Sequence, residues 1–472
     1  MMRRSILSAI TLIISIVSFS QDTWDLVRCV DYAIKNNISV QRADLQSRFS
    51  AIGYIQDKAG RLPSLNFNGS IGYRFGRSEN PTTGVLEDNN FLNSAVQLQS
   101  QVTLFNWFSK KNTQESSRLT WEADKEQTRK VQNDIALNVA VAYLNILLAK
   151  EEVKLAKIQL EQTLSNLSNT RAKVDAGTLP ELNASNIEQQ LAMDSSALIT
   201  AQSNVQRQSL LMKALLNLDA GAPFDLLTPP VDNIPLESLA DLQPESVYTT
   251  ALASMPQQKV NELRILSAKK ASEAAKGNMY PTISAFGNLN TSYVNIKVPE
   301  RQPGPNQPTG AIVNVGGTDY DVFAPSFIFV GGKAIPLGTQ LRNNFGQSVG
   351  IGLSVPIFNG RNLRSAWDRS KLTVVQLEMD KKEADRQLKQ DIYTAYTDAT
   401  AALQKYNADK KAVAAAEKTY DFARKRYDVS MITSFDLLTT QSNLQLARTR
   451  ALYSQYDYVF KMKLLEFYKG QG

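Results

Sequence analysis

Four segments of the chain alternate apolar and polar residues with a period of two. They cover residues 64–76, 94–106, 282–293 and 347–358, and the third is less regular because Phe286 breaks its alternation. Such alternation predicts β-strands with one apolar face and one polar or small face. Each segment has roughly the ten residues that a tilted strand needs to cross a bilayer. A soluble antiparallel sheet with one buried face is the alternative that alternation alone leaves open.

Aromatic residues gather at the ends of these segments. They are Phe105, Trp107, Phe108, Tyr280 and Phe358. Aromatic side chains are enriched where membrane strands meet the bilayer interface. The pattern therefore predicts an interfacial aromatic belt.

Two much longer segments follow the period of a helix. From Ser109 to about Val174 and from Arg361 to about Val429 there is no proline. Each predicts a helix of about 65 to 70 residues, or about 100 Å. Their apolar residues are spaced three and four apart, as in coiled coils. The stripes are Val413, Ala416, Tyr420, Ala423 and Tyr427 in the second segment and Val141, Leu144 and Leu148 in the first.

Each long helix is expected to end in a turn that leads to a second helix. In the first turn, residues 175–180, Gly177 suits a helix C-terminus and Pro180 a helix start. In the second, residues 428–434, Thr433 or Ser434 is the expected N-cap. The pattern predicts two helical hairpins with their tips far from the strands.

The chain is an internal duplication. The Leu104-Phe105-Asn106 run recurs as Ile357-Phe358-Asn359 at an offset of 253, and Pro63 matches Pro281 at an offset of 218. A shared offset over a long stretch indicates two copies of one unit. The difference of 35 residues places an insertion at 297–345, expected to be a solvated surface loop, with a surface lid or receptor site as the alternative. The proline-rich residues 217–245 are interpreted as a linker between the copies.

The N-terminus has the features of an exported protein. Arg3 and Arg4 precede an apolar stretch from Ile6 to Val17 and then small residues. This pattern predicts a cleavable signal peptide at residues 1–20, with an uncleaved anchor as the alternative.

Composition narrows the classes of function. The formal net charge of +7 falls to +5 without Arg3 and Arg4, and no run of Lys and Arg suggests nucleic acid as a partner. Cys29 is the single cysteine and lacks a lipobox, and the chain has no histidine. These absences, together with the lack of a phosphate-binding loop, leave no catalytic, metal or cofactor site to predict, so an enzyme is disfavoured.

Four membrane strands cannot close a barrel, because the smallest barrels have about eight and open edges leave backbone groups unpaired in lipid. If the strands span a membrane, the chain must therefore oligomerise. Long helices leaving one side of such a barrel would continue it as a helical tube.

At this point the sequence strongly resembles the TolC family of outer-membrane efflux proteins. The resemblance covers the duplicated order, the two Phe-Asn runs, and residues 426–430 leading to 435–441. It implies an α+β membrane protein: a homotrimer in the outer membrane in which four strands per protomer form a 12-stranded β-barrel, continued by a coiled-coil α-helical barrel in the periplasm. Such proteins are passive exit ducts of efflux or secretion systems, joined through a periplasmic adaptor to an inner-membrane transporter.

The resemblance also assigns the parts of the chain. Residues 64–106 and 282–358 would be the strand pairs with their external loops, and residues 217–245 the equatorial linker. The helical barrel would comprise residues 22–62, 108–216, 246–280 and 360–470.

The family's periplasmic entrance is narrowed by the helix tips. By position, Asp436 matches an acidic ring and Tyr427 a constricting tyrosine. This chain departs from the pattern at Thr439, Ile432 and Ser430, where the family has a second acid, a basic partner of the tyrosine and a glycine. Asp436 corresponds to Asn183 in the first copy, so three-fold symmetry would give one ring of three carboxylates. The alternatives are a helix-start carboxylate for Asp436 and a core aromatic for Tyr427.

A different class of function remains open. A secreted coiled-coil scaffold or adhesin without a pore would explain the heptads and the signal peptide, but not the duplicated strand pairs. A periplasmic adaptor would need a lipoyl-like module, which we do not find. The exported substrate, the particular pump and the resting state of the entrance are not encoded in these patterns.

Overall fold

The computed structural model describes residues 24–79, 86–88, 90–231 and 234–470. The predicted signal peptide therefore lies outside the described residues. The chain divides into two compact units. The helical unit contains the described residues up to Gly53, Ser116–Lys269 and the chain from Leu372; the strand unit contains Tyr54–Glu115 and Lys270–Lys371.

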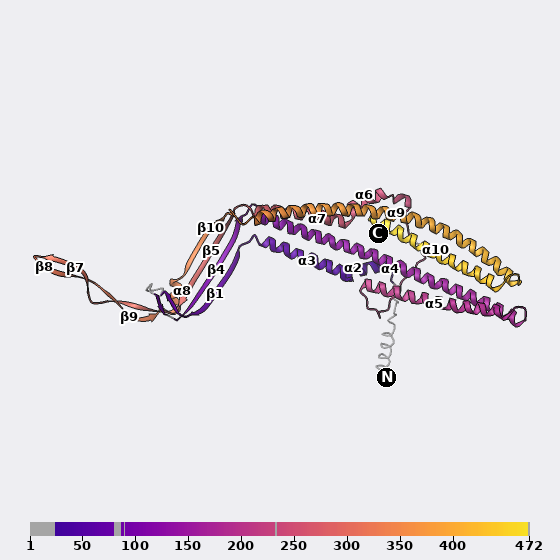
Figure 1. Ribbon diagram of the computed structural model, residues 1–472, viewed down its shortest axis with the longest axis horizontal. Coiled ribbons are helices and arrows are strands. Elements are labelled where there is room, and N and C mark those ends of the chain that lie inside the picture. The colour runs from indigo at the N-terminus through magenta and orange to yellow at the C-terminus, as the bar shows by residue number, and fades with distance from the viewer. Residues whose placement is uncertain (1–23, 80–85, 89, 232–233, 471–472) are drawn as a thin grey trace, which may run out of the picture. The chain divides into compact units, whose positions relative to one another are not determined.

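An antiparallel four-stranded sheet is the centre of the strand unit (Figure 1). Its order is β1 (Ser64–Arg74), β4 (Phe91–Phe105), β5 (Thr282–Val294) and β10 (Gly346–Ser354). These strands lie where the period-two pattern predicts them, except that β10 ends four residues early. Pro356 explains this difference, because proline lacks the N–H that a strand must donate.

The two faces of the sheet differ in chemistry. One face carries apolar side chains from neighbouring strands, such as Phe67, Leu98 and Leu289, which are directly paired. The opposite face carries mainly uncharged amides and hydroxyls, including the cross-strand row Asn66, Gln99, Asn288 and Ser348, with Arg74 at the end of β1. On the amide face, Gln97 donates a hydrogen bond of 3.0 Å to Asn288.

Phe286, which interrupts the predicted alternation, lies on the amide face opposite Gly350. A Cβ added at Gly350 would lie 2.7 Å from the Phe286 ring. Because Gly350 has no side chain, it leaves room for the Phe286 ring. This is a common reason for a glycine within a strand.

The insertion at 297–345 is exposed, as predicted for a solvated loop, but it is built from strands. It contains β6 (Lys297–Pro303), β7 (Gln307–Val315), β8 (Thr318–Ala324), β9 (Phe327–Ala334) and the helix α8 (Leu337–Asn343). Strands β6 and β9 form one ribbon and β7 and β8 another. Gly316 and Gly317 both have positive φ, at 64° and 93°. A tight hairpin needs this conformation, so the Gly-Gly pair was an available signal for the β7–β8 turn. In the first copy, the described residues of the corresponding connection form the short strands β2 (Arg77–Glu79) and β3 (Leu86–Asp88).

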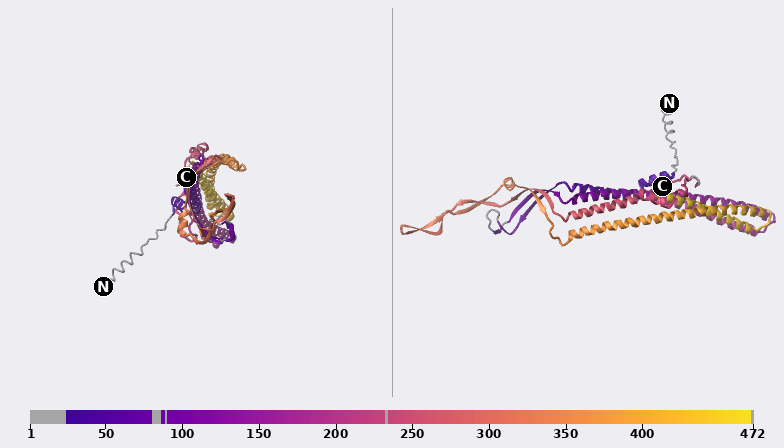
Figure 2. Two further views of the ribbon diagram at one scale, coloured as in Figure 1. Left: turned by 90° about the vertical axis from the view of Figure 1, so that its left-hand side faces the viewer. Right: turned by 90° about the horizontal axis from the view of Figure 1, so that it is seen from above.

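Long helices dominate the rest of the chain (Figures 1 and 2). The two longest, α4 (Ser109–Asp175) and α9 (Asn362–Asp428), are 67 residues each and match the predicted segments closely. Each is followed by a 36-residue helix, α5 (Glu181–Leu216) or α10 (Ser434–Lys469), which completes a hairpin. The other helices of the described residues are α2 (Leu26–Asn36), α3 (Ile38–Ala59), η2 (Leu239–Asp241), α6 (Pro244–Ser254) and α7 (Pro256–Gly277).

The helical unit has apolar clusters rather than one large core. In α9 the predicted stripe is present, with Tyr420, Ala423 and Tyr427 buried. In α4, Val139, Tyr143 and Ile146 are buried, and the predicted Val141, Leu144 and Leu148 are half-buried. Leu144 and Leu148 pack against the same cluster, so the predicted residues lie at its edge.

The linker at 217–245 is attached to the helices. Trp24 forms a parallel bridge with Leu226, and its N–H donates to the Asp225 carbonyl at 3.0 Å. The Tyr143 hydroxyl donates to the Leu227 carbonyl at 2.6 Å. Pro244 begins α6, two residues before the predicted boundary, because proline suits the first turn of a helix.

Candidate functional site at the helix-hairpin tips

Both hairpins end in the same type of turn. At the first tip Gly177 has φ 73°, and the next N–H, from Thr178, donates back to Lys173 at 2.9 Å. At the second tip Ser430 has φ 62°, and Met431 donates back to Arg426 at 2.8 Å. This is the Schellman arrangement, in which a left-handed residue closes the helix. Ser430 adopts the conformation of the family's glycine although it carries a Cβ.

Asp436 lies in the first turn of α10 and forms a capping box. Its Oδ2 accepts from the Thr433 N–H at 3.1 Å and from the Thr433 hydroxyl at 2.7 Å, while the Asp436 N–H donates to the Thr433 Oγ1 at 3.2 Å. The hydrogen bonds from Thr433 lower the pKa of the Asp436 carboxyl below its usual range. Of the two predicted caps, Thr433 is the one used. Asp436 is exposed, so its charge also faces solvent at the tip.

Tyr427 is buried and lies between the two hairpins. Its hydroxyl is 2.8 Å from the Thr170 hydroxyl of α4. The Lys173 ammonium lies 5.1 Å from the centre of the tyrosine ring and donates to the carbonyls of Tyr427 and Asp428. Lys173 thus supplies a basic group beside the tyrosine, where sequence reasoning found only Ile432. The repeat offset of 253 was an available signal, because it matches Lys173 of the first copy with Arg426, the residue before Tyr427.

A buried polar network continues from Tyr427 along the seam between the hairpins. Gln441 of α10 donates to Thr163 at 2.7 Å and accepts from Asn166 at 3.0 Å. Thr163 donates to the Asp194 carboxylate at 2.6 Å, and Gln190 donates to its other oxygen at 2.9 Å. Buried polar groups in helix bundles fix register when every partner is in place. The network therefore joins the two copies side by side near their tips.

The predicted aromatic belt is brought together in part. Trp107 and Tyr280 have ring centres 4.9 Å apart, and Phe105 lies 5.5 Å from Trp107 and 5.7 Å from Phe108. These four residues form a partly exposed cluster where β4 and β5 meet their helices. Phe358 is 89% exposed in the protomer.

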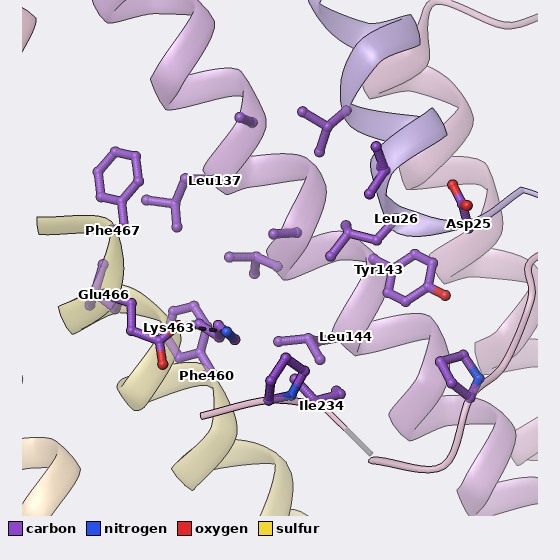
Figure 3. Close-up of a pocket in the computed structure, with 18 of the residues that line it drawn as sticks. Asp25, Leu26, Leu137, Tyr143, Leu144, Ile234, Phe460, Lys463, Glu466 and Phe467 are labelled. Carbon is purple, nitrogen blue, oxygen red and sulfur yellow. Dashed lines mark hydrogen bonds and ion pairs between the residues drawn. The ribbon is translucent and has the colours of Figure 1, made fainter. Parts of the chain in front are cut away.

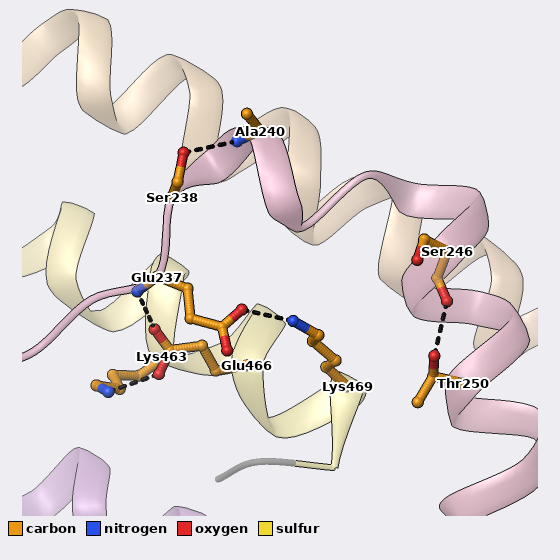
Figure 4. A network of polar contacts seen from close by, with 8 residues as sticks. All are labelled: Glu237, Ser238, Ala240, Ser246, Thr250, Lys463, Glu466 and Lys469. Atoms are coloured by element: carbon orange, nitrogen blue, oxygen red, sulfur yellow. Dashed lines mark hydrogen bonds and ion pairs between the residues drawn. The ribbon is translucent and has the colours of Figure 1, made fainter.

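A cavity of about 470 Å³ lies in the helical unit between α4, the end of α10 and the linker (Figure 3). Most of its lining is apolar and includes Leu137, Leu144, Phe460 and Phe467. Near it, Glu466 is buried and accepts from the Glu237 N–H at 2.9 Å, while Lys469 donates to the Glu237 carboxylate at 2.7 Å (Figure 4). These contacts attach the linker to α10.

The other candidates for chemistry are the single cysteine and any cluster of possible metal ligands. Cys29 is buried in α2, and burial raises its pKa to about 12. Among the described residues, no group of three or more His, Cys, Asp or Glu side chains is arranged to hold a metal ion.

Comparison with known proteins identifies the class. The profile of the outer membrane efflux protein family matches residues 30–218 and 331–467. The chain therefore belongs to this family of outer-membrane efflux channels.

Individual relatives are distant in sequence. The chain is 20% identical to outer membrane efflux protein BepC of Brucella suis over 90% of this chain and 81% of that protein. It is 22% identical to outer membrane protein TolC of Escherichia coli over 70% of this chain and 59% of that protein. A crystal structure of CusC superposes with a TM-score of 0.76 at 17% identity, covering 95% of this chain and 92% of that one. The fold is thus that of a known outer-membrane channel.

Proposed function

We propose that three copies of this chain form a passive exit duct through the outer membrane. Each protomer contributes four strands to a 12-stranded barrel and its long helices to a tunnel in the periplasm. The observation that carries this proposal is the sheet, which has an apolar face, an amide-rich polar face and two strands, β1 and β10, that lie at its edges.

The edges of the sheet support closure by other copies. Edge strands in lipid would leave N–H and C=O groups without partners, and closure is the means of satisfying them. Because β1 and β10 run in opposite directions, β10 of one protomer can pair antiparallel with β1 of the next. The apolar face would then meet lipid and the amide face would line a polar channel.

The aromatic cluster supports the same placement. Phe105, Trp107, Phe108, Tyr280 and Phe358 follow or precede strand ends, where an interfacial belt is expected. Their exposure in the protomer is suited to contact with lipid.

The helical unit would form the periplasmic tunnel, and its hairpin tips would form the entrance that meets a periplasmic adaptor and an inner-membrane transporter. Asp436 would give one ring of three carboxylates there, favouring cations. Tyr427, held by Thr170 and Lys173, would fix the second hairpin at the constriction.

The proposal is tested by planar-bilayer conductance of the detergent-purified mature chain, with the oligomeric mass determined on the same preparation. A trimer with steady single-channel steps is expected. A chain that stays soluble and never inserts would contradict the duct and favour the pore-less scaffold or adhesin.

The entrance ring has its own test. Asp436→Asn should lower the preference for cations over anions, since it removes all three carboxylates of the proposed ring. Asp421→Asn is the matched control, because Asp421 is also exposed and carries the same charge but is paired with Lys425. Equal selectivity in wild type and Asp436→Asn would remove Asp436 from the entrance.

A further inference from the structure

The positive charge of this chain is concentrated where the helices meet the sheet. Four segments join them: residues 54–62, 107–115, 270–281 and 359–371, which we call the collar. The collar holds ten Lys and Arg against four Asp and Glu, a net charge of +6, whereas the whole chain has +7. The rest of the chain is therefore close to neutral.

Contacts between neighbouring segments make the collar continuous within the strand unit. Lys110 donates to the Gly60 carbonyl at 2.6 Å, and Ser109 donates to Asn278 at 2.6 Å. A Cβ at Gly277 would lie 2.9 Å from Ser109, so these segments are closely packed. Ser370 and Ser272 are 3.0 Å apart, which joins the last two segments.

Cationic groups converge on one aromatic ring of the collar. Lys371, Arg364 and Lys276 lie 4.1, 4.7 and 5.7 Å from the centre of the Trp367 ring. Asp368 is shared by Lys371 at 2.8 Å and Arg364 at 3.5 Å. One carboxylate cannot neutralise three cations, and like charges this close repel one another. An external anion at this ring would relieve that repulsion.

Several collar cations are available for such an anion. Within the described part of the chain, Lys111, Lys276 and Arg361 are exposed and make no ion pair with a carboxylate. Lys111 lies 6.0 Å from the centre of the Phe108 ring in the aromatic cluster, and long cationic side chains next to membrane strands reach lipid head groups.

We propose that the collar binds the phosphate head groups of anionic phospholipids in the adjoining leaflet. This inference rests on the proposed membrane barrel. Arg361, Arg364 and Lys276 contact the phosphate, while Trp367 and the aromatic cluster lie against the upper acyl chain and glycerol. The collar then fixes the depth and tilt of the barrel, and its effect falls with salt.

The test uses full-length mature protein in vesicles of phosphatidylcholine containing brominated phosphatidylglycerol or brominated phosphatidylcholine. Bromine quenches the fluorescence of nearby tryptophans, and two of the four tryptophans, Trp107 and Trp367, are in the collar. We expect phosphatidylglycerol to be preferred by at least about threefold at low salt, and the preference to fall at 0.5 M salt, a concentration chosen to shorten the Debye length to roughly 4 Å.

The variant K276Q/R361Q/R364Q should lose this preference. The matched control K157Q/K410Q/K411Q removes the same charge from exposed positions of the helical unit and should keep it. Equal quenching by both lipids in wild type would overturn the inference, as would equal losses in both triple variants. Displacement by millimolar glycerol phosphate would also overturn it, because the site would then be one for free phosphate.

The two proposals fail differently. If the protein inserts and conducts in pure phosphatidylcholine but shows no lipid preference, only the head-group site is wrong. If neither brominated lipid quenches any tryptophan, the chain is not in the membrane and the barrel is wrong as well.

Discussion

The two copies of the repeat keep the same unusual backbone at matching positions while their residues differ. Each copy has a left-handed residue after its long helix, another after its short helix, and a left-handed pair where strand leads to helix. The matching positions are Gly177 and Ser430, Asn217 and Gly470, and Trp107-Phe108 and Gly360-Arg361. Only one member of each set has glycine. Left-handed backbone costs non-glycine residues energy, so this shared geometry indicates that the backbone path, rather than residue identity, is what the two copies have in common.

Side chains at matching positions of the two copies differ in size and polarity. In the first strand pair Asn68 faces Gln97, and at the matching place in the second pair Phe286 faces Gly350. In the helices the polar residues of α4 that build the seam mostly match alanines in α9. The matched positions are Gln159, Thr163, Asn166 and Thr170 in α4 and Ala412, Ala416, Thr419 and Ala423 in α9. The two copies therefore share a backbone path, but their side chains are not interchangeable.

The largest effect is expected from breaking the seam at Gln441. Gln441→Leu removes one hydrogen-bond partner of Asn166 and one of Thr163 while both stay buried. The loss of these buried hydrogen bonds should lower the free energy of unfolding by about 2 to 3 kcal/mol. Thermal unfolding of the protein in detergent, followed by helical circular dichroism, measures it.

The matching position in the first copy supplies the control. Glu188→Leu removes only an exposed ion pair with Arg171, and solvent screening makes the expected loss of stability much smaller. If Glu188→Leu destabilised the protein as much as Gln441→Leu, the seam would not depend on Gln441 more than on its first-copy counterpart, and the predicted difference between the hairpins would be wrong.

The strand pairs give the next largest effect. Gly350→Gln restores the residue of the first copy but places its side chain against the Phe286 ring. Such overpacking should cost about 1 to 3 kcal/mol. Adding Phe286→Asn, which rebuilds the Asn-Gln pair of the first copy, should recover most of the loss.

Strand circular dichroism on heating would follow the single and double variants. Additive losses in the double variant, instead of recovery, would mean that Phe286 and Gly350 are not a coupled pair.

The helix tips should respond in opposite directions. Gly177→Ala forces a Cβ into φ 73° and should destabilise the first tip by about 1 kcal/mol. Ser430→Gly relieves the same strain at φ 62° and should stabilise the second tip by about 0.5 to 1 kcal/mol. Hydrogen exchange at the two tips would resolve each change locally, and equal signs for both would contradict the shared turn.

Periodicity was sufficient to predict the main elements from sequence. The two 67-residue helices and the four sheet strands lie within a few residues of the predicted limits, because an uninterrupted period specifies each of them locally. The insertion was harder to predict, since its strands are short and its Gly316-Gly317 turn is a signal of two residues.

Less of the candidate site than of the fold could be predicted from the sequence. Tyr427 and Asp436 were predicted by position, but Thr170 and Lys173, the partners of Tyr427, lie more than 250 residues away and only packing brings them near it. Tyr143 is a similar case, because its hydroxyl donates to Leu227 of the distant linker. No local pattern encodes which face of a long helix a distant segment will cover.

The smallest effect expected concerns the carboxylate of Asp436 at the second tip, whose matching position in the first tip is Asn183. The pKa of Asp436 is lowered by hydrogen bonds from Thr433, so the folded state binds its proton less tightly than the unfolded state. Its stabilising contribution is complete above the unfolded pKa of about 4 and is lost as pH falls through the lower folded value. Wild type should therefore exceed Asp436→Asn in unfolding temperature at pH 6, and the difference should shrink below pH 4. Asn183→Asp adds a carboxylate at the first tip, where Pro180 offers no capping side chain, and should give a smaller pH dependence. A difference between wild type and Asp436→Asn that stayed constant from pH 6 to pH 3 would mean that the capping box does not depend on the charge of Asp436.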